Sequence, residues 1–221
     1  MSPRICLIHA VQVAIAPIEG SFARLWPEAE RMNLLEDRLS VDRARDGRIS
    51  DDMFRRFGDL ADYAIEAGAA GILYTCSAFG PAIEAVRSRV NIPVFKPNEA
   101  MFDEALRKGK RIGLIATFAP SLPPMLEELQ QMAAARKAEI SVVTACAPAA
   151  MELLNAGNAA RHNELVAAAV PELRGCDVIL LAQFSMAGAR QAVEAVTRVP
   201  VLTSPDSAVV AIRAAVEAAA R

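Results

Sequence analysis

One cysteine stands where a reactive thiol is expected. Cys76 directly follows an apolar stretch, residues 71–74, that predicts a buried strand, and a helix is expected to begin near Gly80 and Pro81. Its thiol would then lie beside free backbone N–H groups and the positive end of the helix dipole. Such surroundings lower the pKa of a thiol toward neutrality and make it a base or a nucleophile. The sequence therefore predicts that Cys76 moves protons or attacks an electrophile.

The segment that carries Cys76 is repeated later in the chain. Residues 71–100 and 178–207 share the order of apolar strand, polar turn, helix, short strand with Pro, and polar turn. Alignment of the two segments sets Cys76 opposite Gln183 and Ala78 opposite Ser185. Duplicated α/β units usually face each other across a cleft. We therefore expect both turns to serve one site, with a thiol on one side and an amide and a hydroxyl on the other.

Polar side chains gather where the predicted strands end. In parallel α/β sheets, ligands bind beyond the carboxyl ends of the strands. Backbone N–H groups and hydroxyls at such ends are suited to a carboxylate, so the sequence predicts a small carboxylate substrate. The residues expected to bind it are Gln12, Thr75, Ser77, Ala78, Thr117, Gln183 and Phe184.

The two histidines are interpreted differently. His9 ends the first predicted strand and fits either a site residue or a packed core residue, whereas His162 lies early in a helix and is expected at the surface. Two histidines and scattered cysteines give no metal-ligand spacing. The glycine-rich phosphate-binding patterns GxGxxG and GxxxxGK[ST] are absent.

Charge and hydropathy exclude two further classes of partner. The formal net charge is −2, and no Lys/Arg stripe of the kind that follows phosphates is present, so nucleic acid is not expected. No apolar stretch approaches the ~20 residues that span a bilayer.

The cysteines and the start of the chain predict a cytoplasmic protein. The four cysteines lie far apart without a CxxC pair, which favours reduced thiols; Cys6, Cys146 and Cys176 are expected to be inert. Residues 5–16 imitate a secretory signal, but His9 and Gln12 interrupt the apolar run, and we expect an uncleaved first strand.

Alternating strands and helices predict an α/β fold with parallel sheets. The composition, 53% hydrophobic but only 5% aromatic, suits an aliphatic core between helices and strands. The expected strands are 5–9, 71–74, 94–95, 111–116, 140–144, 178–182 and 201–202. The expected helices are 51–67, with Ser50 as N-cap and Gly68 at its end, and 81–90, 122–137, 159–173, 188–196 and 208–220.

The repeat predicts two similar lobes. We place the first, which carries Cys76, at residues 1–97 completed by 208–221, and the second, which carries Gln183 and Ser185, at 98–207. Each is expected to be a short parallel sheet flanked by helices. Residues 17–48 form the least regular segment, interpreted as a lid, a partner-facing surface or a solvated connection.

Five motifs carry a family resemblance: IHA at the start, TCSAFGP, IGLIATF, AQFSMAGA and PVLTSPDSA. With these motifs the chain resembles the aspartate/glutamate/hydantoin racemase superfamily over nearly its whole length. The resemblance implies two α/β lobes related by a pseudo-twofold axis, no cofactor, and a homodimer.

The resemblance also implies a mechanism. Two-base racemases of this superfamily place one cysteine after a strand in each lobe, on opposite faces of the substrate α-carbon. Cys76 matches the first position, but the second is Gln183, and an amide cannot take or give a proton at neutral pH as a thiol does. The candidates for a second proton donor are His9 and Ser185.

Other readings of the single thiol remain open. The leading hypothesis is a racemase or isomerase acting at the α-carbon of a small carboxylate. The related arylmalonate decarboxylases protonate a carbanion with one cysteine, although theirs lies in the second lobe. Maleate isomerases use a cysteine as a nucleophile but keep two. A catalytically inactive protein that binds a small anion is the alternative outside enzymes.

Overall fold

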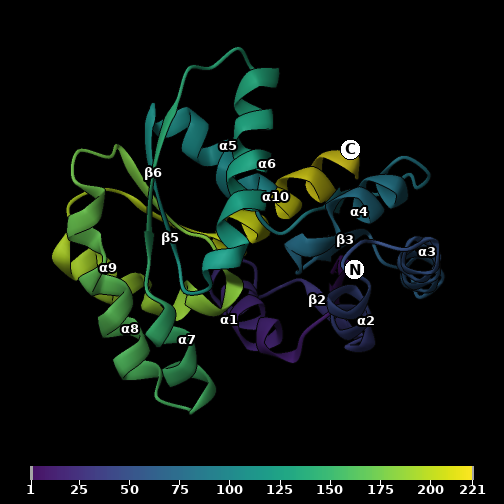
Figure 1. Ribbon diagram of the computed structural model, residues 1–221. Coiled ribbons are helices and arrows are strands. Elements are labelled where there is room, and N and C mark those ends of the chain that lie inside the picture. Colours follow the sequence, from purple (N-terminus) through teal and green to yellow (C-terminus); the bar gives the residue numbers. More distant parts are fainter. Residues whose placement is uncertain (1, 221) are drawn as a thin grey trace. The chain divides into compact units, whose positions relative to one another are not determined.

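A computed structural model describes residues 2–220, and the chain divides into two compact units. Unit 1 comprises Met1–Pro97 and Ala208–Arg221, and unit 2 comprises Asn98–Ser207. Each unit holds one four-stranded parallel sheet with helices packed alongside, so the predicted α/β class with two similar lobes is correct (Figure 1).

The sheet of unit 1 has the strand order β2-β1-β3-β4. Its strands are β1 (Arg4–His9), β2 (Glu30–Leu35), β3 (Gly71–Tyr74) and β4 (Val94–Phe95). The connecting helices are α1 (Ile15–Leu25), α2 (Arg38–Asp46), α3 (Asp51–Glu66) and α4 (Gly80–Arg87). The central strands β1 and β3 are almost wholly buried, as expected of parallel strands covered on both faces.

The sheet of unit 2 has the corresponding order β6-β5-β7-β8. Its strands are β5 (Arg111–Ala116), β6 (Ser141–Cys146), β7 (Val178–Leu181) and β8 (Val201–Thr203). The helices are α5 (Glu99–Lys108), α6 (Leu122–Ala135), α7 (Pro148–Asn155), α8 (Ala159–Ala168) and α9 (Arg190–Val196). Helix α10 (Ser204–Ala219) starts in unit 2 and continues into unit 1.

The strand registers confirm the internal repeat. Ile8 pairs with Tyr74 in the first sheet and Ile115 with Leu181 in the second, so both partners are shifted by the same number of positions. The edge strands differ slightly between the units, because Arg4 pairs with Glu30, 26 positions later, whereas Arg111 pairs with Ser141, 30 positions later. Cys76 and Gln183 therefore occupy equivalent places, each just beyond the end of its central strand.

Helix α3 shows how the sequence sets an element of unit 1. The Ser50 side chain accepts a hydrogen bond from the Met53 N–H, which confirms the predicted N-cap. Gly68 takes a positive φ of 81° after the last turn, where a residue with a Cβ is strained. Between these ends Phe57 lies against Tyr74 and Phe79, with ring centroids 5.0 and 4.9 Å away. The helix thereby packs against β3 and the turn that follows it.

The prediction that residues 17–48 are irregular is wrong. This segment forms most of α1, all of β2 and all of α2. Strand β2 was missed because it is an edge strand, ERMNLL, whose side chains are half-exposed or exposed and show no continuous apolar run. The chain has no long loop here, so the interpretation as a lid is withdrawn.

Other local predictions also need correction. Helices α5 and α7 were missed, and α10 begins at Ser204 and not at residue 208, so the polar turn expected at the end of 178–207 is mostly the first turn of α10. The stretch expected as one helix over 159–173 is α8 followed by a 3-10 helix, Val170–Leu173, which contains Pro171. In Figure 1, α7, α8 and α9 lie together beside β5 and β6.

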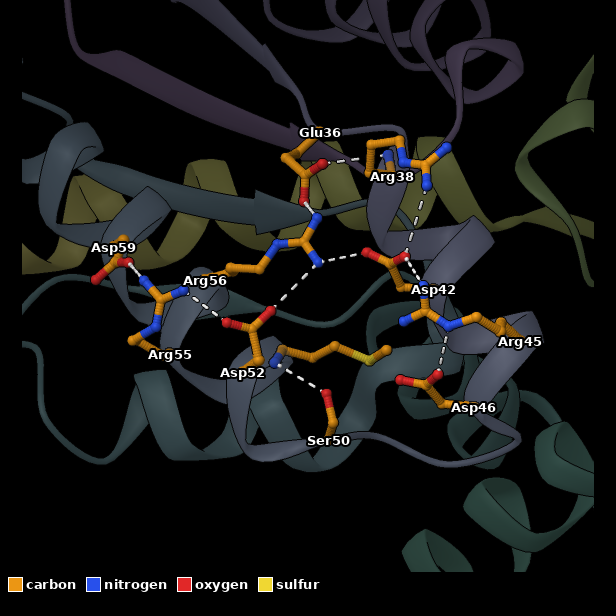
Figure 2. Close-up of polar contacts among 11 residues, drawn as sticks. Glu36, Arg38, Asp42, Arg45, Asp46, Ser50, Asp52, Arg55, Arg56 and Asp59 are labelled. Atoms are coloured by element: carbon orange, nitrogen blue, oxygen red, sulfur yellow. Dashed lines mark hydrogen bonds and ion pairs between the residues drawn. The ribbon is translucent and has the colours of Figure 1, made fainter.

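A charge cluster ties α2, α3 and the end of β2 together (Figure 2). Its centre is Arg56, which pairs with Glu36, with Asp42 at 2.7 Å and with Asp52 at 3.6 Å. The hydrogen bond from Arg56 holds the pKa of Asp42 below its usual range. The cluster pairs the charges on this part of unit 1 (Figure 2), whereas the core of the unit consists of apolar side chains.

Candidate active site

Cys76 lies where the sequence placed it, directly before the first turn that follows β3. It precedes the 3-10 helix η2 (Ser77–Phe79) with extended backbone angles, φ −125° and ψ 117°. Its Sγ accepts a hydrogen bond from the backbone N–H of Ala78, which is the kind of donor expected at a helix start. Ser77 and Ala78 are exposed, so the turn presents its backbone to solvent.

The expectation that these surroundings lower the pKa of Cys76 is wrong. Burial raises the pKa of the thiol, and the hydrogen bond from the Ala78 N–H offsets only part of that rise. The cause is visible in the packing: the thiol borders a recess lined by Leu39, Phe57 and Tyr74 that is too tight to admit a water molecule. Cys76 is therefore a protonated thiol at neutral pH.

His9 is fully buried at the end of β1, with both ring nitrogens engaged. Its Nδ1 lies 2.8 Å from Thr75 Oγ1, and its Nε2 lies 2.9 Å from Asn33 Oδ1. Asn33 in turn donates from Nδ2 to Glu19 Oε1 over 2.7 Å. Burial lowers the pKa of His9, and the hydrogen bond to Asn33 and the charge of Glu19 oppose that change. His9 is therefore neutral at pH 7.

The corresponding turn of unit 2 is organised by Gln183. Its Oε1 accepts hydrogen bonds from the Thr117 backbone N–H at 2.7 Å and from Thr117 Oγ1 at 2.9 Å. A backbone N–H only donates, so the atom facing Thr117 must be the amide oxygen. The amide NH2 group of the half-buried Gln183 therefore points away from Thr117.

The remaining predicted residues divide by burial. Ser185 is half-buried in the 3-10 helix η5 (Phe184–Ala189), and Gln12 is exposed in the 3-10 helix η1 (Gln12–Ala14). Phe184 is buried, 6% exposed, and Thr75 is 5% exposed with its hydroxyl turned to His9. Within unit 1 the structure thus brings His9, Thr75 and Cys76 together, and within unit 2 it brings Thr117 and Gln183 together.

Sequence reasoning missed Asn33 and Glu19, and it misplaced His162. Asn33 was hidden because β2 was not recognised, and Glu19 because α1 was not. The signal that could have found Asn33 is the pairing of β2 with β1, which places Asn33 near the end of β1 that carries His9. His162 was expected at the surface but is 1% exposed, with Nδ1 bonded to Asn163 Oδ1, because α8 packs against α7, α9 and η5.

Two kinds of feature are absent from the described part of the chain. Within residues 2–220, no group of three or more His, Cys, Asp or Glu side chains is arranged to hold a metal ion. Among the same residues, no helix has the length and apolar character needed to cross a membrane. The four cysteines are free thiols, and Cys6 and Cys176 are buried.

Comparison of the sequence with protein families gives one match, to Asp/Glu/Hydantoin racemase, over residues 30–212. The chain belongs to this family. No curated protein sequence matches it significantly.

Solved structures share the fold of this racemase-family chain. An aspartate racemase homologue from Pyrococcus horikoshii superposes with a TM-score of 0.73 at 15% identity, with 100% of both chains covered. Allantoin racemase from Pseudomonas fluorescens gives 0.71 at 19% identity, covering 98% of this chain and 92% of its own. A mutant of arylmalonate decarboxylase gives 0.67 at 19% identity, covering 97% and 94%. These likenesses establish the fold.

Proposed function

We propose that this member of the racemase family transfers a proton at the α-carbon of a small carboxylate, without a cofactor, and that Cys76 is its acid/base. The observation that supports the proposal is the placement of Cys76, with its Sγ held by the Ala78 N–H in the first turn after β3. A thiolate formed at this turn keeps that charge-assisted hydrogen bond.

The proposed step moves one proton and one electron pair. The Cys76 thiol first gives its proton to water. The thiolate then removes the α-proton, and the C–H electron pair passes into the adjacent carboxylate, which becomes an enediolate. Donors held in place before the reaction stabilise this developing charge. The backbone N–H groups of the η2 turn are such donors, and the exposed Ser77 hydroxyl beside the thiol is suited to bind the substrate carboxylate.

Racemisation needs a second donor that returns a proton to the opposite face. Unit 2 offers Ser185, whose side chain is half-buried and follows Gln183 closely in the chain. Gln183 cannot fill this role, because an amide does not exchange protons at neutral pH as a thiol does. We propose isomerisation in which Cys76 is the acid/base at the α-carbon, and Ser185 is the residue of unit 2 whose chemistry fits the second donor.

One observation favours a second candidate, decarboxylation of a substituted malonate. Burial raises the pKa of Cys76, so the resting thiol carries the proton that such a reaction consumes. In that reaction the bond to one carboxylate breaks and CO2 leaves. The electron pair stays on the α-carbon as an enediolate, and the Cys76 S–H protonates it; the thiolate then regains a proton from water. This reaction needs a single acid, in keeping with the single thiol.

Proton exchange in heavy water tests the proposal for both reactions. Amino acids, hydantoins and substituted malonates are incubated with the protein in D2O, and α-deuterium is followed by NMR. We expect incorporation into at least one compound, with loss of incorporation in Cys76→Ser and retention in the control Cys146→Ser. Scrambling of enantiomers identifies a racemase, and CO2 release identifies a decarboxylase. Absence of exchange with every compound, or exchange that survives Cys76→Ser, would contradict the proposal and leave an anion-binding protein.

A further inference from the structure

A hydrogen-bond chain runs from the surface of unit 1 to the residue beside Cys76. It begins at Glu19 on α1, continues through Asn33 on β2 and His9 on β1, and ends at Thr75 just after β3. Its links measure 2.7, 2.9 and 2.8 Å. The outer end is anchored by Arg31, whose Nε pairs with Glu19 Oε2 at 2.9 Å. The chain thus joins three neighbouring strands at the edge of the sheet that carries Cys76.

The position of every proton in this chain follows from its outer end. The Glu19 carboxylate accepts only, so Asn33 must present its NH2 group to Glu19 and its oxygen to His9. An amide oxygen also accepts only, so His9 carries its proton on Nε2. A neutral ring then has an unprotonated Nδ1, and this atom accepts the hydroxyl proton of Thr75. The Thr75 proton is therefore directed inward.

The equivalent positions of unit 2 hold no such chain. In the register of the central strands, His9 corresponds to Ala116 and Thr75 to Ala182. In the edge-strand register, Asn33 corresponds to Thr144. The second sheet forms the same strand order with these residues, so the fold itself does not require the chain. Of the two sheets described, only the one that carries the thiol has it.

We propose that Glu19, Asn33, His9 and Thr75 form a positioning chain that fixes the strand end carrying Cys76, and that His9 and Thr75 do not contact the substrate. This inference rests on the proposed function of Cys76. His9 becomes a positioning residue in place of the second proton donor considered from the sequence. The Thr75 hydroxyl, committed to His9, is not a carboxylate donor, which leaves that role to Ser77 and the backbone of η2.

The first experiment reads the tautomer of His9 and needs no substrate. Nitrogen-15 NMR of the imidazole rings distinguishes a protonated Nε2 with bare Nδ1 from the reverse. We expect the Nε2–H form in wild type. Glu19→Gln frees Asn33 to turn its NH2 group toward His9, so the Nδ1–H form should appear beside it. The control Glu30→Gln removes the same charge from the exposed start of β2 and should leave the His9 tautomer unchanged. An Nδ1–H form in wild type, or equal spectra for Glu19→Gln and Glu30→Gln, would contradict the proposed hydrogen-bond chain.

The second experiment separates positioning from substrate contact. On a compound that exchanges in D2O, Thr75→Val should lower kcat about tenfold with KM nearly unchanged, because misplacement of Cys76 impairs the chemical step. A raised KM with unchanged kcat would show that Thr75 binds substrate and would refute the proposal. Asn33→Asp keeps an acceptor for Nε2–H and should keep the wild-type tautomer. If no compound exchanges, the proposed function fails while the NMR result still stands on its own.

Discussion

Gln183 and Thr117 form a doubly hydrogen-bonded pair in unit 2, in which one amide oxygen accepts both the backbone N–H and the hydroxyl of Thr117. Thr117 follows β5 directly and is 1% exposed, so its two donors have little access to water. Gln183 follows β7, the neighbour of β5 in the sheet. Gln183, at the place in unit 2 equivalent to that of Cys76, therefore has a structural role: it joins the ends of two central strands.

Replacing Gln183 by Ala should destabilise unit 2. The substitution leaves the buried N–H and hydroxyl of Thr117 without their acceptor, which costs about 1–3 kcal/mol. We expect a lower urea midpoint by circular dichroism and faster hydrogen exchange of the Thr117 amide. In Gln183→Glu a carboxylate oxygen accepts both bonds, so exchange at Thr117 should stay slow. Equal protection of that amide in wild type and Gln183→Ala would show that the pair contributes nothing.

Arg55 and Arg56 offer a matched test of the charge cluster in Figure 2. The Arg55 side chain is 63% exposed and pairs with Asp52 and Asp59, whereas the Arg56 side chain is 19% exposed and pairs with acids from three segments. Arg55→Ala should lower the urea midpoint only slightly, because exposed ion pairs contribute little to stability. Arg56→Ala leaves Asp42 without its main partner and should lower the urea midpoint more than Arg55→Ala does. A larger loss in Arg55→Ala than in Arg56→Ala would contradict this account.

Cys6 should make the stability of the protein fall in alkali. Burial raises the pKa of this thiol from 9.0 to about 12 in the folded chain. Between these values the folded state holds a proton that the unfolded state has released, so the free energy of unfolding decreases as pH rises. The contribution is fully present below pH 9 and falls by about 1.4 kcal/mol per pH unit above it.

Cys6→Ala isolates this contribution from those of other groups that titrate in alkali. The lost packing of the sulfur lowers stability equally at every pH, so only the slope reports the thiol. Urea unfolding at several pH values above 9 should give a shallower decline for Cys6→Ala than for wild type. Parallel lines for the two proteins would mean that Cys6 ionises normally in the folded state.

The sequence was sufficient for the elements whose signals are local. The central strands read as uninterrupted apolar runs, and α3 carries its own N-cap at Ser50 and its terminating Gly68. Edge strand β2 was missed because its pairing in the sheet is with β1, and a local window of residues around β2 does not contain β1. Charged residues in β2 and α2 then read as loop, although they are the partners that hold these elements together.

In the candidate site, too, the features set by local sequence were predicted, and those set by distant segments were not. The repeat identified Cys76 and Gln183 as equivalent, because their position depends only on the strand before them. The pKa of Cys76 was predicted in the wrong direction, because the local helix start suggested a stabilised thiolate. The wall of Leu39, Phe57 and Tyr74 that removes water comes from three separate elements. Likewise, the commitment of the Thr75 hydroxyl to His9 depends on Asn33, which belongs to another strand far from Thr75 in the sequence.

Ser77 should determine substrate affinity and not the rate of the chemical step. It is exposed at the start of η2, next to the thiol. Because the Thr75 hydroxyl is bonded to His9, the side-chain donor that this turn offers to a carboxylate is the Ser77 hydroxyl. A hydrogen bond to a carboxylate contributes about 1.5–3 kcal/mol. Ser77→Ala should therefore raise KM about tenfold or more and leave kcat within a few-fold, because binding is lost equally in ground and transition states.

The control for this prediction is Ser121→Ala, which removes a hydroxyl that bonds the Phe118 carbonyl in unit 2. It should leave both KM and kcat unchanged. Steady-state exchange rates in D2O over a range of substrate concentrations give both constants. A fall in kcat at constant KM for Ser77→Ala would place the hydroxyl on the transition state alone. Ser77 would then stabilise the enediolate selectively, and carboxylate binding would have to come from the backbone N–H groups of the turn.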